Sequence, residues 1–327
     1  MDIDERTGQF QRVYAAVREQ LDRVIVGHDA VKDQMLTALL AGGHALVEGV
    51  PGLGKTLLVR TLAEAIHVEF RRIQFTPDLM PADIIGTNVI QEDERGNRSF
   101  RFERGPVFGN IILADEINRA TPKTQSAMLE AMQEESVTVA GLRHRLDPPF
   151  LVVATQNPIE MEGTYPLPEA QLDRFLLKIF VQSSSVKELV EIVDRTTVKE
   201  TRSAEPVATG AEILSMRELV REVPVASHVK EYIARLVLAT HPTSEDAPEV
   251  TRRYVRYGAS PRGAQAITLS AKVRALVEGR SNVSFEDVEA VARPALRHRI
   301  IFNFEGEAEG LQADAVIEEV VRHVRKP

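Results

Sequence analysis

Gly49-Val50-Pro51-Gly52-Leu53-Gly54-Lys55-Thr56 is the stretch that decides the fold. It joins an apolar segment, His44 to Glu48, to a helical pattern from about Lys55 to Ile66. Its glycines let backbone N–H groups approach a phosphate with no Cβ in the way, and the following helix N-terminus adds partial positive charge. The spacing of glycine, four residues, glycine, lysine and threonine therefore predicts a phosphate-binding loop between a strand and a helix.

The residue types within this loop predict ATP and Mg²⁺ as its ligands. Lys55 can reach the β- and γ-phosphates, and the hydroxyl of Thr56 can bind Mg²⁺. The predicted nucleotide contacts run along the loop into the helix: Gly49, Val50, Pro51, Gly52, Leu53, Gly54, Lys55, Thr56 and Leu57.

An acid pair follows the loop by about sixty residues, at the end of an apolar strand pattern, Ile111 to Ala114. Ligands bind outside the carboxyl ends of strands in doubly wound sheets, so Asp115 is expected beside the phosphate loop as a holder of Mg²⁺. Glu116 is expected to orient or deprotonate the attacking water. A helix-capping aspartate followed by a solvated glutamate is the structural alternative.

The order of patterns along the chain predicts an α/β fold with a second, all-helical part. Buried strands alternating with helices indicate a parallel sheet covered on both faces. After about Ser183 the patterns are helical only. We therefore expect an α/β nucleotide-binding domain over 1–183 and a helical lid domain over 184–327.

Composition excludes several classes of protein. The 327 residues include no cysteine, which excludes disulfides, and the eight histidines show no ligand spacing for a structural zinc. No apolar run approaches the roughly 20 residues that span a bilayer, and the polar N-terminus is unlike a signal peptide, so a cytoplasmic location is expected. The net charge of −8 argues against gross affinity for nucleic acid.

Two short segments have the pattern of inserted hairpins, near 86–103 and 136–147. The first would turn at the polar run Glu92 to Arg98, and the second at Ala140-Gly141. On their own, both are explained equally well as surface hairpins without a role.

A wider set of motifs resembles the MoxR family of AAA+ ATPases over roughly residues 20 to 310. The phosphate loop is shared by many proteins, whereas the combination is specific. The motifs are Asp115-Glu116-Ile117-Asn118-Arg119-Ala120, Gln125 to Glu134, Ala154-Thr155-Gln156-Asn157-Pro158 and Leu167-Pro168-Glu169-Ala170-Gln171-Leu172-Asp173-Arg174-Phe175. The resemblance implies an α/β core, a helical lid and a ring, usually a hexamer, with ATP at subunit boundaries.

The resemblance also implies roles for single residues. Asn157 matches sensor 1, Arg174 matches an arginine finger supplied to the neighbouring subunit's ATP, and Arg262 matches sensor 2. The alternative for Arg174 is a salt bridge with Asp173 or a nearby acid. The segment Ile25-Val26-Gly27 resembles the part that packs on adenine, with plain core packing as its alternative.

The resemblance implies ATP-driven, chaperone-like remodelling or maturation of a protein partner, such as metal or cofactor insertion. The partner often carries a von Willebrand factor A domain in this family, and both hairpins normally face the ring pore. Alternatives are a nucleic-acid motor, the ATPase subunit of a metal chelatase, and a nucleotide-controlled switch. Arg143, His144 and Arg145 are the local support for nucleic acid, but the turn Glu92 to Arg98 has no aromatic residue for base stacking.

Overall fold

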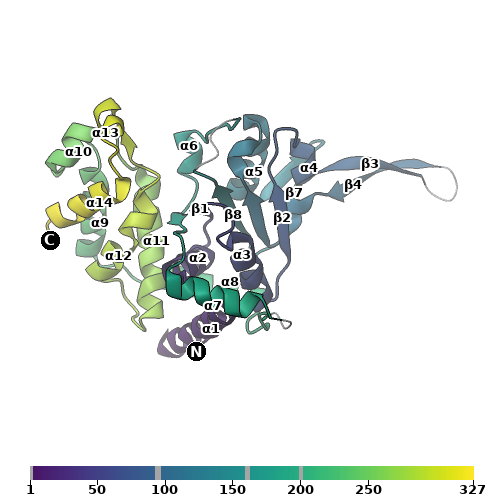
Figure 1. Ribbon diagram of the computed structural model, residues 1–327, viewed down its shortest axis with the longest axis horizontal. Helices are drawn as coiled ribbons and strands as arrows, with labels where there is room; N and C mark the ends of the chain where they lie inside the picture. The colour runs from purple at the N-terminus through teal and green to yellow at the C-terminus, as the bar shows by residue number, and fades with distance from the viewer. Residues whose placement is uncertain (1–2, 93–96, 159–162, 199–201) are drawn as a thin grey trace.

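The computed structural model describes residues 3–92, 97–158, 163–198 and 202–327 of the chain. Residues 93–96, in the predicted turn of the first hairpin, lie outside this range. Figure 1 shows an α/β body in the middle, a helical body at one end and a long hairpin projecting from the other end. The predicted α/β fold with a helical lid is confirmed. No helix within the described residues combines the length and the apolarity that a membrane crossing requires.

The α/β body is built on a five-stranded sheet with the order β2-β5-β8-β1-β9. All of its neighbouring strands are parallel, so their carboxyl ends share one edge. Four of the five residues in β5 and five of the six in β8 are buried, because helices cover both faces. The strands are β1 (Ala45–Glu48), β2 (Phe70–Gln74), β5 (Ile111–Asp115), β8 (Leu151–Gln156) and β9 (Leu177–Phe180).

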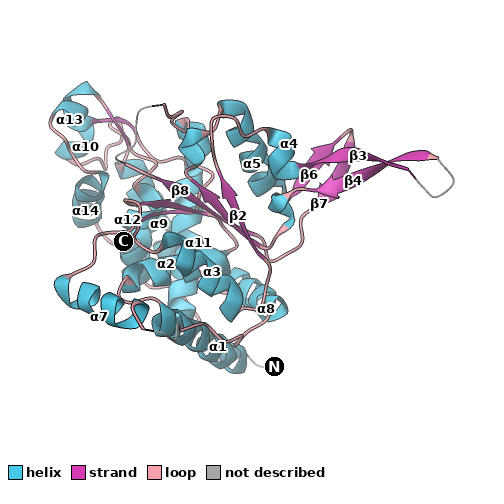
Figure 2. Cartoon of the chain, turned by 45° about the vertical axis from the view of Figure 1, so that its right-hand side comes forward, coloured by secondary structure: helices cyan, strands magenta, loops and turns pink. Residues whose placement is uncertain are grey.

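Alternate residues of the strands β1, β5 and β8 enter two separate cores. In β5, Leu113 belongs to the larger core and its neighbour Ile112 to the smaller one, as the period of two in a strand requires. The larger core includes the helices α1 (Ile3–Val24), α2 (Asp29–Ala41), α3 (Lys55–Ala65) and α8 (Gly210–Glu222). The smaller core includes α4 (Pro81–Ile85), α5 (Pro122–Glu134) and the 3₁₀ turns η1 (Pro106–Phe108) and η2 (Ile117–Arg119). Figure 2 shows helices on both sides of the sheet.

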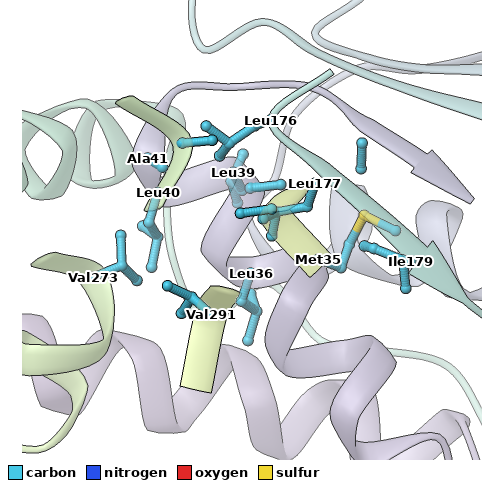
Figure 3. Close-up of a cluster of buried hydrophobic side chains, with 14 of the residues drawn as sticks. Met35, Leu36, Leu39, Leu40, Ala41, Leu176, Leu177, Ile179, Val273 and Val291 are labelled. Carbon is cyan, nitrogen blue, oxygen red and sulfur yellow. The ribbon is translucent and has the colours of Figure 1, made fainter. Parts of the chain in front are cut away.

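The helical body packs directly on the sheet. Leu36 of α2 and Leu177 of β9 lie in one cluster with Val273 and Val291, so the apolar core continues from the sheet into the lid (Figure 3). The remaining helices are α6 (Glu169–Leu172), α7 (Val186–Thr196), α9 (Ser227–Ala239), α10 (Glu249–Tyr254), α11 (Pro261–Val277), α12 (Phe285–Leu296), α13 (Phe304–Ala308) and α14 (Ala313–His323).

The expectation that the second part is helical only was wrong in one detail. Two very short strands, β10 (Val255–Tyr257) and β11 (Ile301–Phe302), pair antiparallel within it. The boundary between 183 and 184 remains a prediction. Arg217 of α8 donates its Nε–H to the Leu39 carbonyl of α2 at 2.7 Å, so α8 is bonded to the α/β body.

Both inserted hairpins are present. The first consists of β3 (Gly86–Glu92) and β4 (Arg98–Arg104), and the second of β6 (Ser136–Val139) and β7 (Leu142–Arg145). The rings of Phe102 and His144 stack with centroids 4.0 Å apart, so the two hairpins pack together at their base. The first hairpin then extends beyond the second, away from the body (Figures 1 and 2).

Candidate nucleotide site

The phosphate loop joins β1 to α3 with the geometry that its glycines require. Gly52 and Gly54 have φ angles of 86° and 76°, a region where a side chain is strained. The ammonium group of Lys55 donates a hydrogen bond to the Gly49 carbonyl. Burial lowers the pKa of Lys55, while Asp115, Glu116 and Glu48 act to raise it. The lysine is thus partly removed from water and aimed into its own loop.

Four of the predicted catalytic residues line one pocket of about 400 Å³ at the carboxyl edge of the sheet: Lys55, Asp115, Glu116 and Asn157. The order of the strands explains why these residues meet. Because β8 lies between β5 and β1, the carboxyl ends of these three parallel strands are neighbours. The pocket is lined by Pro51, Gly52, Gly54, Lys55, Thr56, Leu57, Arg72, Gln74, Asp115, Glu116 and Asn157. Residues from the loop, the acid pair and the sensor 1 position therefore share one site, while their individual roles remain predictions.

Thr155 of β8 holds the acid pair in place. Its hydroxyl donates to Asp115 Oδ1 at 2.6 Å, and its oxygen accepts from the Glu116 backbone N–H at 2.8 Å. Glu116 adopts a φ of 56°, which turns its side chain away from the strand direction. One hydroxyl thus fixes both acids, a role that sequence reasoning missed.

Arg72 and Gln74 of β2 also reach the acid pair and were missed as site residues. Arg72 donates to Asp115 Oδ2 at 2.6 Å, and Gln74 donates to Glu116 Oε2 at 3.0 Å. Arg119 also contacts Glu116 Oε2, at 3.1 Å. The signal in the sequence was the spacing of two residues, which places Arg72 and Gln74 on one face of a strand.

The oxygen atoms that line the pocket are suitable ligands for Mg²⁺. Thr56 and Asp115 offer a hydroxyl and a carboxylate, which are the hard oxygen ligands that this ion takes. Within the described ranges, no group of three or more His, Cys, Asp or Glu side chains could hold a metal by itself. The ion would therefore depend on phosphate oxygens and water for its other ligands, as is usual for Mg²⁺.

The predicted adenine segment lies beside the loop. A narrow apolar cavity of about 10 Å³ is lined by Ile25 and His28, together with Leu53, Lys55 and residues of α2, α3, β1 and β8. Val26 is buried next to it, and Gly27 has a φ of 63°. The cavity is too small for a purine, so a base placed here requires its lining to shift.

Arg174 and Arg262 lie together in a different place. Both line a second cavity of about 290 Å³, whose described lining contains no residue of the phosphate loop. Arg174 donates to the Leu129 carbonyl at 3.0 Å. The alternative ion pair with Asp173 is not found among the described residues, because the Asp173 carboxylate binds Arg299 and Ser260 instead.

The hairpins carry an apolar pair that sequence reasoning missed. Ile90 and Phe100 are directly opposite in the register of the first hairpin, and their exposed fractions are 63% and 76%. Phe100 lies two residues beyond the polar run Glu92 to Arg98, which itself contains no aromatic residue. In the second hairpin, Arg143 is engaged with Ser136 Oγ at 2.8 Å.

Two family models match the chain. The ATPase family associated with various cellular activities (AAA) matches residues 44–177, and the AAA lid domain matches residues 248–320. The first match contains the phosphate loop, the acid pair, Asn157 and Arg174, and the second contains Arg262.

Similar proteins cover nearly the whole chain. Chaperone MoxR1 of Mycobacterium tuberculosis is 44% identical over 94% of this chain and 81% of its own length. Protein MoxR of Paracoccus denitrificans is 31% identical over 92% of each chain. A crystal structure of a protein from Cytophaga hutchinsonii named as an ATPase superimposes with a TM-score of 0.92 and 41% identity, over 99% of this chain and 97% of that one.

Proposed function

We propose that this chain, which belongs to the MoxR family of AAA+ ATPases, uses ATP hydrolysis to remodel or mature a protein partner. ATP hydrolysis itself follows from the family. The proposal concerns what the hydrolysis drives. It rests on where the chain places its arginines and its exposed apolar residues.

The observation that carries the proposal is the separation of the two arginines from the pocket of their own phosphate loop. Arg174 and Arg262 share one cavity, while Lys55, Asp115 and Glu116 share another. Arginines that stabilise transferred phosphate must lie beside it. A neighbouring copy, in a ring that we expect to be hexameric, would bring this pair of arginines to the ATP of the next subunit.

The projecting hairpin supports a protein as the substrate of the motor. Ile90 and Phe100 form an exposed apolar pair, which fits apolar side chains of a protein surface. Phe100 also offers a ring for base stacking, which favours the nucleic-acid alternative. Two arginines of the hairpins are paired with acids, however, since Arg98 contacts Glu92 at 3.2 Å and Arg143 contacts Glu134 at 3.9 Å. Phosphate binding needs several free cations, so we favour a protein.

The kind of partner comes from the family. A relative with 44% identity bears the name chaperone, which supports remodelling or cofactor insertion in a client. We propose a client or co-chaperone with a von Willebrand factor A domain, and a cytoplasmic site of action. The alternative hypothesis, an ATPase subunit of a metal chelatase, shares the architecture and differs in the client. Identification of the captured protein therefore distinguishes the two hypotheses.

ATP turnover in the presence of added macromolecules tests this function. Protein captured by a Glu116→Gln chain with ATP should stimulate turnover of the wild type, whereas single- and double-stranded DNA and RNA should not. Phe100→Ala should reduce the stimulation severalfold and leave basal turnover unchanged. Phe304→Ala, at another highly exposed phenylalanine on the lid, is the matched control.

Stimulation of turnover by nucleic acid would contradict the proposal of a protein client. Salt-sensitive stimulation by DNA or RNA that disappears in an Arg143→Ala, Arg145→Ala double variant would replace the protein client with a nucleic-acid track. The measurement is turnover at two salt concentrations. With a protein client, the same double variant should impair stimulation by the captured protein more than basal hydrolysis.

A further inference from the structure

Asp173 connects the α/β body to the lid beside the cavity that Arg174 and Arg262 both line. It precedes Arg174 in the chain and lines the same cavity as Arg174 and Arg262. Its Oδ1 accepts from Arg299 Nε at 2.8 Å, and its Oδ2 accepts from the hydroxyl of Ser260 at 2.7 Å. Both partners belong to the lid, so one carboxylate joins two bodies of the molecule.

Arg299 anchors the backbone around Asp173 as well as its side chain. Its NH2 group donates to the Phe175 carbonyl at 2.8 Å and to the Asp173 carbonyl at 3.1 Å. The guanidinium is nearly fully buried, and burial lowers the pKa of Arg299, an effect that Asp173 opposes. A buried cation held by several acceptors has little freedom to move. The segment that carries Arg174 is thus fixed to the lid.

Ser260 completes the connection to Arg262. It is the N-cap residue of α11, and its oxygen accepts the Arg262 backbone N–H at 3.1 Å. The same hydroxyl donates its proton to Asp173. The start of the helix that carries Arg262 is therefore tied, through one hydroxyl and one carboxylate, to the residue before Arg174.

We propose that Asp173 is a positioning residue that holds Arg174 and Arg262 at a fixed separation, so that both act on the ATP of a neighbouring subunit as one unit. The inference rests on the proposed function, in which the arginines act across a subunit boundary. A movement of the lid then carries the arginine finger with it. The nucleotide state of one subunit can thereby set the position of the arginine finger that this subunit supplies to the next one.

Kinetics of Asp173→Asn test this inference. The amide keeps the size of the side chain but removes its charge and one acceptor. Misplacement of catalytic groups by about 1 Å costs about 100-fold in rate, so turnover per assembled subunit should fall by about 10- to 100-fold. The KM for ATP should stay within about twofold, because each subunit keeps its own phosphate loop.

A matched control is available at another contact between the lid and the α/β body. Arg297 donates to the Lys178 carbonyl at 3.2 Å and to Asp314 Oδ2 at 2.9 Å. Asp314→Asn removes a carboxylate partner of a buried arginine, as Asp173→Asn does, but neither Asp314 nor Arg297 lines the cavity of Arg174 and Arg262. Its turnover should remain within about twofold of wild type. An equal loss in both variants would show that any loosening of the lid has the same effect, and would overturn the inference.

A double-mutant cycle separates positioning from simple stabilisation. If Asp173 acts through the arginines, Asp173→Asn should cost less than about threefold in an Arg262→Ala background. If it only supports the fold, its full penalty should persist there, and the inference fails. Should Asp173→Asn not fold, Ser260→Ala in the same cycle takes its place, since it removes a single hydroxyl.

The failure of this inference is distinguishable from failure of the proposed function. If Arg174→Ala does not lower turnover at all, the proposed action across subunits fails, and the coupling fails with it. If Arg174→Ala acts across subunits while Asp173→Asn and Arg262→Ala are fully additive, only the coupling is overturned.

Discussion

The pocket at the phosphate loop and the cavity that holds the two arginines are built from the same kinds of side chain, yet they differ in how firmly these are held. At the loop, Asp115 is paired with Arg72, whose side chain is 48% exposed. At the cavity, Asp173 is paired with Arg299, whose side chain is 3% exposed. Exposed pairs contribute about 0–1 kcal/mol, whereas breaking a buried pair costs about 3–5 kcal/mol.

This difference in burial distinguishes ion pairs that a ligand can replace from ion pairs that hold the lid and the α/β body together. Mg²⁺ or phosphate can displace Arg72 from Asp115 at little cost. A ligand has no comparable means to displace Arg299 from Asp173. We infer that ligands rearrange the side chains at the phosphate loop. The two arginines at the second cavity, in contrast, reach a neighbouring subunit as one rigid unit.

Arg174→Ala should have the largest effect on turnover. Removal of an arginine finger typically costs about 10³–10⁵ in rate, because developing charge on the phosphate loses its partner. Binding of ATP to each subunit's own loop should be unchanged. The measurement is steady-state hydrolysis beside direct nucleotide affinity.

Mixed rings show whether this arginine acts across a boundary. Arg174→Ala protein combined with Lys55→Ala protein creates some boundaries with an intact loop and an intact finger. Activity of the mixture should then exceed that of either variant alone. Mixed rings with no recovery would assign Arg174 to the structure of α5, where it contacts the Leu129 carbonyl.

Glu116→Gln should have the next largest effect, at the phosphate-loop pocket. General base catalysis contributes about 10²–10⁴-fold, and the amide cannot accept the proton of water. ATP affinity should be retained because Lys55 and the loop are unchanged. Lys55→Ala is the contrast, since it removes a charge-assisted phosphate contact and should weaken binding itself. Wild-type turnover in Glu116→Gln would remove Glu116 from the reaction.

The smallest expected effect is on the pH dependence of stability, and it comes from a residue of the arginine cavity. His44, which is buried and lines that cavity, accepts the Val152 N–H at Nδ1 (3.0 Å), and its Nε2 contacts the Met132 carbonyl at 2.9 Å. Acceptance at Nδ1 requires a neutral ring, in which Nε2–H donates to the Met132 carbonyl, and burial lowers the pKa of His44 from 6.5 to about 4. The unfolded chain therefore binds more protons than the folded chain between these pH values.

Stability should consequently fall as the pH falls below 6.5. His44 alone should account for a loss of about 2 kcal/mol in the free energy of unfolding between pH 7 and pH 5. Urea unfolding at both pH values measures it, and His44→Gln should reduce the difference. His298, whose pKa is also lowered by burial, adds to the slope in the same direction. His323→Gln, at an exposed site, should leave the difference as in wild type; an unchanged difference in His44→Gln would contradict the assignment.

Several features of the molecule could be predicted from local sequence. The helix α3 begins at Lys55, as predicted, and both inserted hairpins form where their patterns placed them. The phosphate loop and the acid pair were found because phosphate contact requires particular residues at fixed spacing. Short-range geometry determines all of these features, so the adjacent residues were sufficient.

The tertiary structure alone decided which distant residues meet. Arg72 reaches Asp115 because β2 lies next to β5, and strand order cannot be read from the pattern of a single strand. The short pair β10–β11 carries too few residues for a period of two to be visible.

The partner of Asp173 shows the same limit at the site itself. Sequence placed it beside Arg174 and made an ion pair between them the alternative, whereas the fold gives its carboxylate to Arg299 and Ser260. A sequence lists the charges that have to be balanced. Only the packing of the lid against the sheet determines which charges lie within bonding distance, because electrostatic pairing depends on separation in space and on burial.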